Sequence, residues 1–298
     1  RMLVSKALSD HRSGKVLYDA GASLEREVAR LGHFPDKRAK SKGIEPEGME
    51  AAKFGDQQYF FVLLERASLM AVYKDTGGEP ELVQLLPSGI SPEGAVAIPA
   101  RNLIASANEV DLGEDGGARS HVMIYELAEA EKAYPTIVSN DVDGTPIGWG
   151  ALSGLVGDAE KDGILYAVSD SFYGMQPSIF TIDASRKPAE ITGVTRITRG
   201  GQPAQKLDIE GIALDGKGGF WFASEGDSAK FVGHGIYNVN AKGEIKAEIA
   251  LPVELLSGQT RFGLEGITTI GECDKLTLWM AVQREWKDDE KGIVKLLS

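Results

Sequence analysis

Acidic residues recur at the same two points of five similar segments in this chain of 298 residues. Each segment opens with a residue followed by glycine, and the opening residues are Glu47, Glu93, Ser153, Glu210 and Glu265. Two apolar runs separated by a turn follow, and they close on Glu65, Glu109, Asp170, Glu225 and Glu285. Carboxylates brought together from such points could bind a hard divalent cation or transfer protons.

The segment from Leu207 to Asp227 indicates how these acids are positioned. One apolar run follows Glu210, a glycine-rich turn spans Asp215 to Gly219, and a second apolar run ends at Glu225. Short apolar runs on either side of such a turn are typical of a β-hairpin. Since the start of the first strand and the end of the second lie side by side in a hairpin, we expect Glu210 and Glu225 at the same end.

The spacing of the five segments predicts the architecture. Successive openings are 46, 60, 57 and 55 residues apart, which leaves room for one or two further strands, as in a blade of a β-propeller. Repeats of this kind bury their faces by stacking on one another. We therefore predict an all-β fold, a β-propeller of about five to seven four-stranded blades, with residues 1–298 as a single domain. An open solenoid is the structural alternative.

A propeller would gather the repeated acids on one face, where like charges require a counter-charge. Three arginines (Arg66, Arg261 and Arg284) lie close to these acids in the sequence, too few to neutralise them. We therefore predict a Ca²⁺ or Mg²⁺ site, because hard cations take carboxylate oxygens. The predicted metal ligands are Glu47, Glu93, Glu109, Asp170, Glu210 and Glu265. The predicted catalytic residues are Glu210, Glu225 and Glu265, and the predicted substrate contacts are Arg66, Arg261 and Tyr173.

A purely structural role for the opening residues is the alternative. Their carboxylates would then accept backbone N–H bonds from a neighbouring blade, and each glycine would permit close approach of two backbones. Ser153 departs from the pattern, because it stands where the other four segments have glutamate. The ring of acids would then be asymmetric, and a metal site with an open coordination position needs such an asymmetry. Ser153 does not have the context of a hydrolase nucleophile, because Ala151 stands where that turn needs glycine.

Composition narrows the classes of partner. The net charge of −12 and the isoelectric point near 4.9 argue against nucleic acid and anionic membranes as partners. No apolar run approaches the roughly 20 residues that span a bilayer. Cys273, the single cysteine, is expected in a turn as an incidental thiol. Because Arg1 is not a start residue, the sequence is expected to be a mature or trimmed piece of a longer protein.

The first 43 residues carry different signals. Lys15–Asp19 predicts a short strand, and Ala22–Leu31 predicts a helix with Ser23 as its N-cap. A basic loop follows, with Lys37, Arg38, Lys40 and Lys42. It is interpreted as a solvated loop, with binding of an anionic substrate as the alternative.

Two family resemblances rest on these motifs. Residues 38–48, with Leu63–Arg66 and Ile104–Glu109, resemble the choice-of-anchor I family of bacterial surface and secreted propellers. From Pro146 onward the motifs 165–170, 207–213 and 220–226 resemble the family described as esterase-like activity of phytase. Both resemblances imply a propeller and a periplasmic or extracellular location. Neither implies a particular reaction.

The functional prediction is a secreted or periplasmic, phytase-like hydrolase. It would be metal-dependent and would act on a small anionic ester of phosphate or a carboxylic acid at an acidic mouth. A non-catalytic, Ca²⁺-stabilised surface or adhesion propeller is an alternative of another class, since a propeller does not dictate function. A gluconolactonase-like lactonase, with a divalent ion held by an axial glutamate, is the third reading. The sequence leaves the oligomeric state open.

Overall fold

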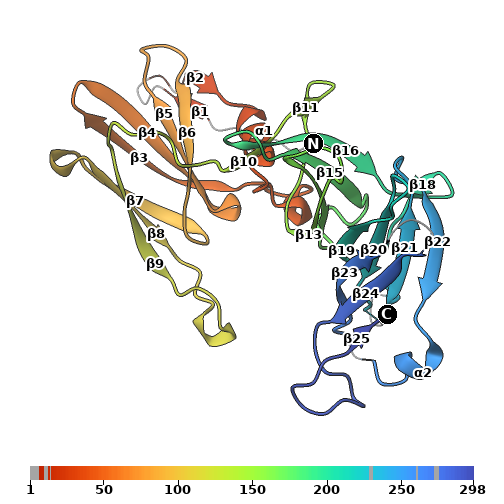
Figure 1. Ribbon diagram of the computed structural model, residues 1–298. Helices are drawn as coiled ribbons and strands as arrows, with labels where there is room; N and C mark the ends of the chain where they lie inside the picture. Colours follow the sequence, from red (N-terminus) through yellow and green to blue (C-terminus); the bar gives the residue numbers. More distant parts are fainter. Residues whose placement is uncertain (1–6, 10–12, 14, 228–230, 260, 272–274) are drawn as a thin grey trace. The chain divides into compact units, whose positions relative to one another are not determined.

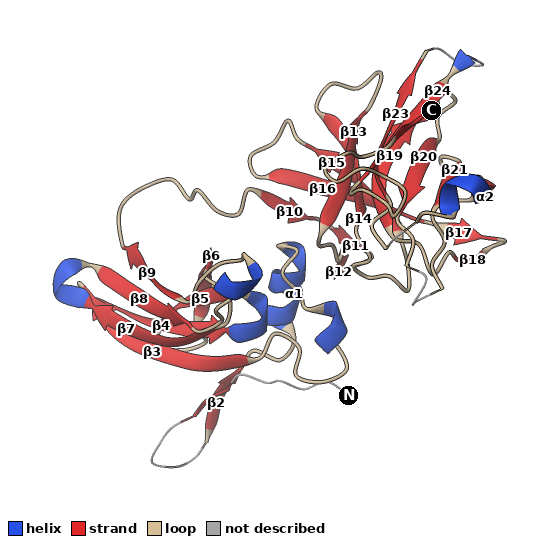
Figure 2. Ribbon diagram, turned by 90° about the horizontal axis from the view of Figure 1, so that it is seen from below, coloured by secondary structure: helices blue, strands red, loops and turns tan. Residues whose placement is uncertain are grey.

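The structure is a computed structural model that describes residues 7–9, 13, 15–227, 231–259, 261–271 and 275–298. It is all-β, with 47% of residues in strands and 9% in helices. Figure 2 shows the predominance of strands in both parts of the chain. The strands form small antiparallel sheets within two compact units, residues 1–138 and 139–298. The closed propeller and its blade number stay predictions. The turn expected at Cys273 lies outside the described residues.

The first unit contains two larger sheets of consecutive strands (Figure 1), besides a two-stranded N-terminal pair described below. The four-stranded sheet consists of β3 (Pro46–Phe54), β4 (Gln57–Leu64), β5 (Leu69–Lys74) and β6 (Glu81–Pro87). The three-stranded sheet consists of β7 (Pro92–Ile98), β8 (Leu103–Asn108) and β9 (His121–Glu126). Short 3-10 helices span Asp36–Arg38, Glu65–Ala67, Pro99–Arg101 and Gly113–Asp115. Both β3 and β4 contact β7, so the two larger sheets pack together.

The N-terminal elements follow the sequence prediction in outline. Strand β1 (Ala7–Ser9) pairs with β2 (Val16–Asp19), and helix α1 (Ser23–Arg30) comes next. Both the predicted strand and the predicted helix are confirmed. The predicted N-cap is wrong, because Ser23 is already helical and its hydroxyl donates to the carbonyl oxygen of Ala20 at 2.7 Å.

The second unit contains three larger sheets and two short strand pairs. The first consists of β13 (Leu152–Gly157), β14 (Ile164–Ser169), β15 (Ser178–Asp183) and β16 (Ala189–Arg196), with β10 (Ile137–Ser139), where the unit boundary falls, along β16. The second consists of β19 (Ile209–Leu214), β20 (Phe220–Ser224), β21 (Gly235–Val239) and β22 (Ile245–Ala250). The third consists of β23 (Leu264–Ile270), β24 (Thr277–Val282) and β25 (Leu296–Leu297). The short pairs are β11 (Asp141–Val142) with β12 (Thr145–Pro146) and β17 (Thr198–Arg199) with β18 (Gln202–Pro203), and α2 (Val253–Leu256) is a short helix.

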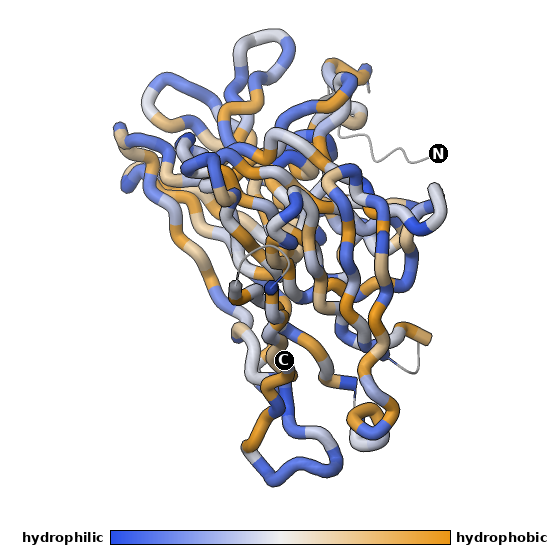
Figure 3. Tube along the Cα trace, turned by 45° about the vertical axis from the view of Figure 1, so that its right-hand side comes forward, coloured by the Kyte–Doolittle hydropathy of each residue, from blue (hydrophilic) through white to orange (hydrophobic). Residues whose placement is uncertain are grey.

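Each unit has its own apolar core. Figure 3 shows hydrophobic and hydrophilic residues interspersed along the strands, as expected for sheets with a buried face. Leu64 and Leu69 are buried in the first unit, where Leu24 and Val28 of α1 join them. In the second unit Phe222 is buried between sheets, since it packs with residues of β14, β15 and β19.

All five predicted hairpins form, and each contains the same β-bulge. In β3, Pro46 pairs with Leu64 and Gly48 pairs with Leu63, so Glu47 is the extra residue. The other bulge residues are Glu93, Ser153, Glu210 and Glu265. Bulges re-aim side chains and are frequent beside active sites. The opening residues of the sequence repeat are therefore the residues that the bulges turn out of the regular strand pattern.

A second shared contact defines the closing residue of each hairpin. Its backbone N–H donates to the carbonyl oxygen of the residue two positions before the bulge, at 2.8–3.1 Å. The donor–acceptor pairs are Glu65–Glu45, Glu109–Ser91, Asp170–Ala151, Glu225–Asp208 and Gln283–Gly263. The fifth pair corrects the sequence analysis, because β24 ends at Val282 and Gln283, rather than Glu285, takes the closing position.

The glycine after the bulge allows neighbouring sheets to approach closely. A Cβ atom on Gly48 would lie 2.3 Å from the carbonyl oxygen of Glu93. A Cβ atom on Gly154 would lie 3.1 Å from the Cα of Gly211, and one on Gly211 would lie 2.8 Å from the backbone nitrogen of Ile267. These distances are shorter than normal contacts, so the structural role expected for the glycines holds at these three positions.

Candidate metal and catalytic site

Two closing carboxylates are bound by hydrogen-bond donors of the next sheet. In the first unit the hydroxyl of Ser91 donates to Glu65 at 3.0 Å. In the second unit the backbone N–H of Gly263 donates to Glu225, also at 3.0 Å. Ser91 and Gly263 each stand two residues before a bulge. The closing acid therefore acts at these junctions as a clamp between neighbouring hairpins.

The junction between β14 and β19 differs, because the residue two positions before the bulge is itself an acid. Asp170 follows β14, Asp208 precedes β19, and Glu210 is the bulge residue of β19. One oxygen from each of these three carboxylates lies within 4.8 Å of the others. This junction therefore has an acid, Asp208, at the position where the other two junctions have a hydrogen-bond donor to the closing acid.

Serine hydroxyls hold this cluster of Asp170, Asp208 and Glu210, which we call the carboxylate triad. Ser171 donates to Asp208 at 2.7 Å and contacts Asp170 at 3.3 Å. Ser153, the one opening residue without a carboxylate, donates to the side chain of Glu210 and contacts its carbonyl oxygen at 3.1 Å. The departure of Ser153 from the acidic repeat thus provides a donor for the neighbouring glutamate.

Burial and the repulsion of neighbouring carboxylates raise the pKa values of three glutamates here, Glu210, Glu265 and Glu225. Burial raises the pKa of Glu210 to about 7, with the charges of Asp170, Glu265 and Asp208 acting in the same direction against the Ser153 hydrogen bond. Burial also raises the pKa of Glu265, with the charges of Asp170 and Asp208 adding to it. The pKa of Glu225 is raised by burial as well, although the N–H of Gly263 opposes the change.

The carboxylate triad fits a hard divalent cation. A Ca²⁺ ion binds oxygens at about 2.4 Å, so two ligands of one ion lie at most about 5 Å apart. The triad oxygens meet that limit, and a cation would relieve the repulsion among them. Asp170, Asp208 and Glu210 are therefore the residues that would hold Ca²⁺ or Mg²⁺.

Comparison with protein families shows which families the chain resembles. A family model described as "Esterase-like activity of phytase" matches residues 147–298, which is half of the chain and includes the whole triad. The chain belongs to this phytase-like family. A second model, the Choice-of-anchor I domain, matches residues 5–78 and fits a cell-surface or secreted protein. Both resemblances read from the sequence are confirmed.

Solved structures resemble the phytase-like chain only distantly. Hydrazine synthase from Kuenenia stuttgartiensis has 9% identity and a TM-score of 0.29, over 80% of this chain and 56% of that one. An exo-β-1,3-galactanase from Phanerochaete chrysosporium has 12% identity and a TM-score of 0.30, over 82% and 58%. The chain thus spans less than two thirds of either protein, and such TM-scores carry no argument. No protein of curated function matches the sequence.

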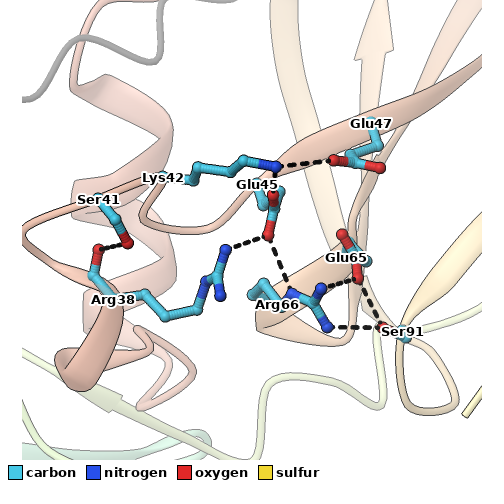
Figure 4. A network of polar contacts seen from close by, with 8 residues as sticks. All are labelled: Arg38, Ser41, Lys42, Glu45, Glu47, Glu65, Arg66 and Ser91. Atoms are coloured by element: carbon cyan, nitrogen blue, oxygen red, sulfur yellow. Dashed lines mark hydrogen bonds and ion pairs between the residues drawn. The ribbon is translucent and has the colours of Figure 1, made fainter.

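Two acids of the first unit, Glu45 and Glu65, are paired with basic side chains. Glu45, two residues before the bulge, is bound by Arg38, Lys42 and Arg66, with 2.9 Å between Glu45 Oε2 and Arg66 Nε (Figure 4). The contact with Lys42, together with Arg66 and Arg38, lowers the pKa of Glu45 to about 2. Arg66 also contacts Glu65 at 2.7 Å. We call these five residues the basic clamp; it shows the predicted substrate residue Arg66 engaged with carboxylates of the protein.

The predicted metal ligands of the first unit lie close together. Glu65, Glu93 and Glu109 form a group of carboxylates within 4.8 Å, and Glu47 belongs to another with Glu45 and Glu65. Burial and the charges of Glu109 and Glu65 raise the pKa of Glu93. In contrast to the triad, both groups include Glu65, whose charge Arg66 balances.

Sequence reasoning missed Glu45 and Asp208 as site residues. The signal was present, because each is an acid two residues before the acid of a bulge, in Glu45-Pro46-Glu47 and Asp208-Ile209-Glu210. The hairpin pattern alone did not show that Asp208 lies beside Asp170 of the preceding sheet or that Glu45 lies beside Arg38, Lys42 and Arg66.

The predicted substrate residues of the second unit line separate cavities. Tyr173 and Phe172, with ring centroids 4.8 Å apart, line a cavity of about 500 Å³ that Ser169 and Arg196 also border. Ser171 and Tyr173 have positive φ angles of 29° and 54°, unusual for residues other than glycine. Arg261 lines a cavity of about 640 Å³ and lies 3.9 Å from Asp227.

Proposed function

We propose that the phytase-like unit hydrolyses an ester of phosphoric or carboxylic acid, with a divalent cation at the carboxylate triad. The observation that carries this proposal is the junction of Asp170, Asp208 and Glu210, where three acids meet within 4.8 Å. The family description supports the choice of an ester substrate. The positive φ angles of Ser171 and Tyr173, close to Asp170 in the chain, also support the proposal, since backbone strain clusters at functional sites.

The residues of the chain would have distinct roles. A divalent cation supplies electrophilic polarisation of the ester when bound. Asp170, Asp208 and Glu210 would hold it, and Ser153 and Ser171 would orient Glu210 and Asp208 through their hydroxyls. Glu265 and Glu225 are the candidate bases; the N–H of Gly263 already fixes the orientation of Glu225.

The Choice-of-anchor I match supports an exported location, periplasmic or extracellular. Among the described residues, no helix has the length and apolar character needed to cross a membrane.

A non-catalytic, Ca²⁺-stabilised surface module is the second candidate function. The basic clamp and the two clamped closing acids favour it, because they tie carboxylates into the scaffold rather than presenting them to a ligand. Only the hydrolase would turn over a substrate. The surface module would melt at a higher temperature with Ca²⁺ but would hydrolyse nothing.

Hydrolysis of a small panel tests the proposal. Purified protein is incubated with p-nitrophenyl phosphate, p-nitrophenyl acetate and a simple lactone, with Ca²⁺ or Mg²⁺ and then with chelator. We expect turnover of one ester that chelator abolishes and that Glu210→Gln lowers by about 100-fold or more, the effect of losing a strong electrostatic contribution. Glu160→Gln, which removes an exposed acid of the same unit, is the matched control and should keep full activity.

Each alternative has its own outcome. Full activity of Glu210→Gln, or activity that chelator does not change, would contradict the proposal. Metal-dependent melting without turnover would select the surface module. Turnover of the lactone alone would select the lactonase.

A further inference from the structure

The second unit contains a cavity of about 640 Å³ that is lined mainly by segments connecting its strands. Its lining comes from the segment before β21, from the end of β22, from the segment around α2 and from Lys287 beyond β24. Arg261, Lys287 and His234 supply all of its ionisable groups among the described residues. A cavity with basic and no acidic lining is unusual in a chain with a net charge of −12.

The imidazole of His234 is held in a defined position in this cavity. The backbone N–H of Gly226 donates to its Nδ1 at 3.0 Å, so the neutral ring carries its proton on Nε2. A Cβ atom on Gly226 would lie 2.4 Å from the ring, and one on Gly263 would lie 1.9 Å from Nδ1. His234 is 9% exposed, with the ring of Trp286 at 5.7 Å. The two glycines therefore leave room that the imidazole fills.

The backbone of Lys287 is held at this cavity, and the side chains of both cations are exposed beside it. The backbone N–H of Lys287 donates to the carbonyl oxygen of Gly258 at 2.9 Å, which ties the segment after β24 to the segment after α2. The ion pair between Arg261 Nε and Asp227 Oδ2 is long, at 3.9 Å, and the Arg261 side chain is 65% exposed, so the guanidinium is accessible to a ligand.

The cavity adjoins a candidate base. Gly226 follows Glu225 directly, and Gly263, which borders His234, donates its N–H to Glu225. The charge of Arg261 also acts on Glu225. A group bound among Arg261, Lys287 and His234 would therefore lie beside the carboxylates of the proposed reaction.

We propose that this cavity binds an oxyanion, a phosphate or carboxylate group carried by the substrate. The guanidinium of Arg261 and the ammonium of Lys287 are donors, and charge-assisted bonds from such groups to oxyanions are strong. The inference rests on the proposed function for its link to hydrolysis, and it narrows the substrate class to esters that carry an anionic group besides the bond that is cleaved.

Calorimetric titration of the full chain tests the site without turnover. Inorganic phosphate and, separately, acetate are titrated in the presence of chelator and at constant ionic strength, so that no bound cation can capture the anion. We expect saturable binding of at least one of them. The double variant Arg261→Gln/Lys287→Gln should bind it at least about tenfold more weakly, since charged hydrogen bonds are worth roughly 1.5–3 kcal/mol each.

The matched control removes two exposed lysines of the same unit, as Lys161→Gln/Lys242→Gln. It loses the same charge and should bind as the unaltered protein does. Binding of neither anion, or equal binding by the two double variants, would overturn the proposal. The anion that binds identifies the group as phosphate or carboxylate. Anion binding without any ester hydrolysis would contradict only the proposed function, and hydrolysis without this binding would contradict only the anion site.

Discussion

The position two residues before each bulge decides what its carboxylate can do. Glu45 and Asp208 occupy equivalent positions, since each accepts the N–H of a closing residue. Glu45 is surrounded by Arg38, Lys42 and Arg66, whereas Asp208 lies beside two further carboxylates. An acidic side chain at one position therefore supports a structural ion-pair network in one unit and a candidate cation site in the other.

The basic clamp makes a prediction about acid stability. The pKa of Glu45 is about 2 in the folded protein and 4.5 for an unperturbed glutamate, so the unfolded chain binds a proton first as the pH falls. Its contribution to stability is present above pH 4.5 and is lost as the pH falls toward 2. Glu45→Gln should lower the free energy of unfolding at pH 7 by roughly 1–3 kcal/mol. The difference from the unaltered protein should shrink between pH 4.5 and pH 2.

Denaturant unfolding at pH 7, 4 and 2.5 measures that difference. Glu50→Gln, in strand β3, which begins directly after Glu45, but partly exposed and outside the basic clamp, is the control and should follow the unaltered protein at every pH. A difference for Glu45→Gln that stays constant down to pH 2.5 would mean that ionisation of Glu45 does not stabilise the fold.

At the scale of elements, the hairpins could be predicted from sequence and their exact register could not. Apolar runs around glycine-rich turns are local signals, so all five hairpins and α1 were found. The bulge depends on which residues pair across two strands, and the Glu45 contacts depend on residues up to 21 positions away. Gln283 was missed for the same reason. The repeat led us to expect an acid at the closing position, and Glu285 supplied one, but the pairing register of β24 places Gln283 there.

The bulge glycines make a prediction that separates close packing from backbone freedom. Gly211→Ala would place a Cβ 2.8 Å from the backbone nitrogen of Ile267, so two backbones must move apart. We expect a loss of roughly 1–3 kcal/mol in unfolding free energy. Gly266→Ala is the matched control at the equivalent position of the next sheet, where no described atom lies within 4 Å of the new Cβ. Thermal melting of both variants measures this; an equal loss in both would show that close packing is not the cause.

At the scale of the whole molecule, net charge complicates any test of a cation site. A chain with 44 acidic and 32 basic residues attracts divalent cations everywhere on its surface. Screening of that charge would stabilise the fold without any specific site. The triad in the second unit and the carboxylate group of Glu65, Glu93 and Glu109 in the first are the sites that a specific effect must distinguish.

Calcium-dependent melting at constant ionic strength makes the distinction. If the triad binds Ca²⁺, a hundredfold excess over Kd adds about 2.7 kcal/mol to the stability of the folded protein. For a unit of this size that corresponds to a rise in Tm of roughly 5–10 °C. Asp208→Asn should remove most of the rise, because it takes one ligand from the triad and leaves the first unit intact. Glu109→Gln changes the first unit instead and should keep the rise, since Arg66 already balances the charge of Glu65 there. If Glu109→Gln loses the rise in Tm and Asp208→Asn keeps it, the cation binds in the first unit. If both variants show the same rise, Ca²⁺ acts only by screening the surface charge.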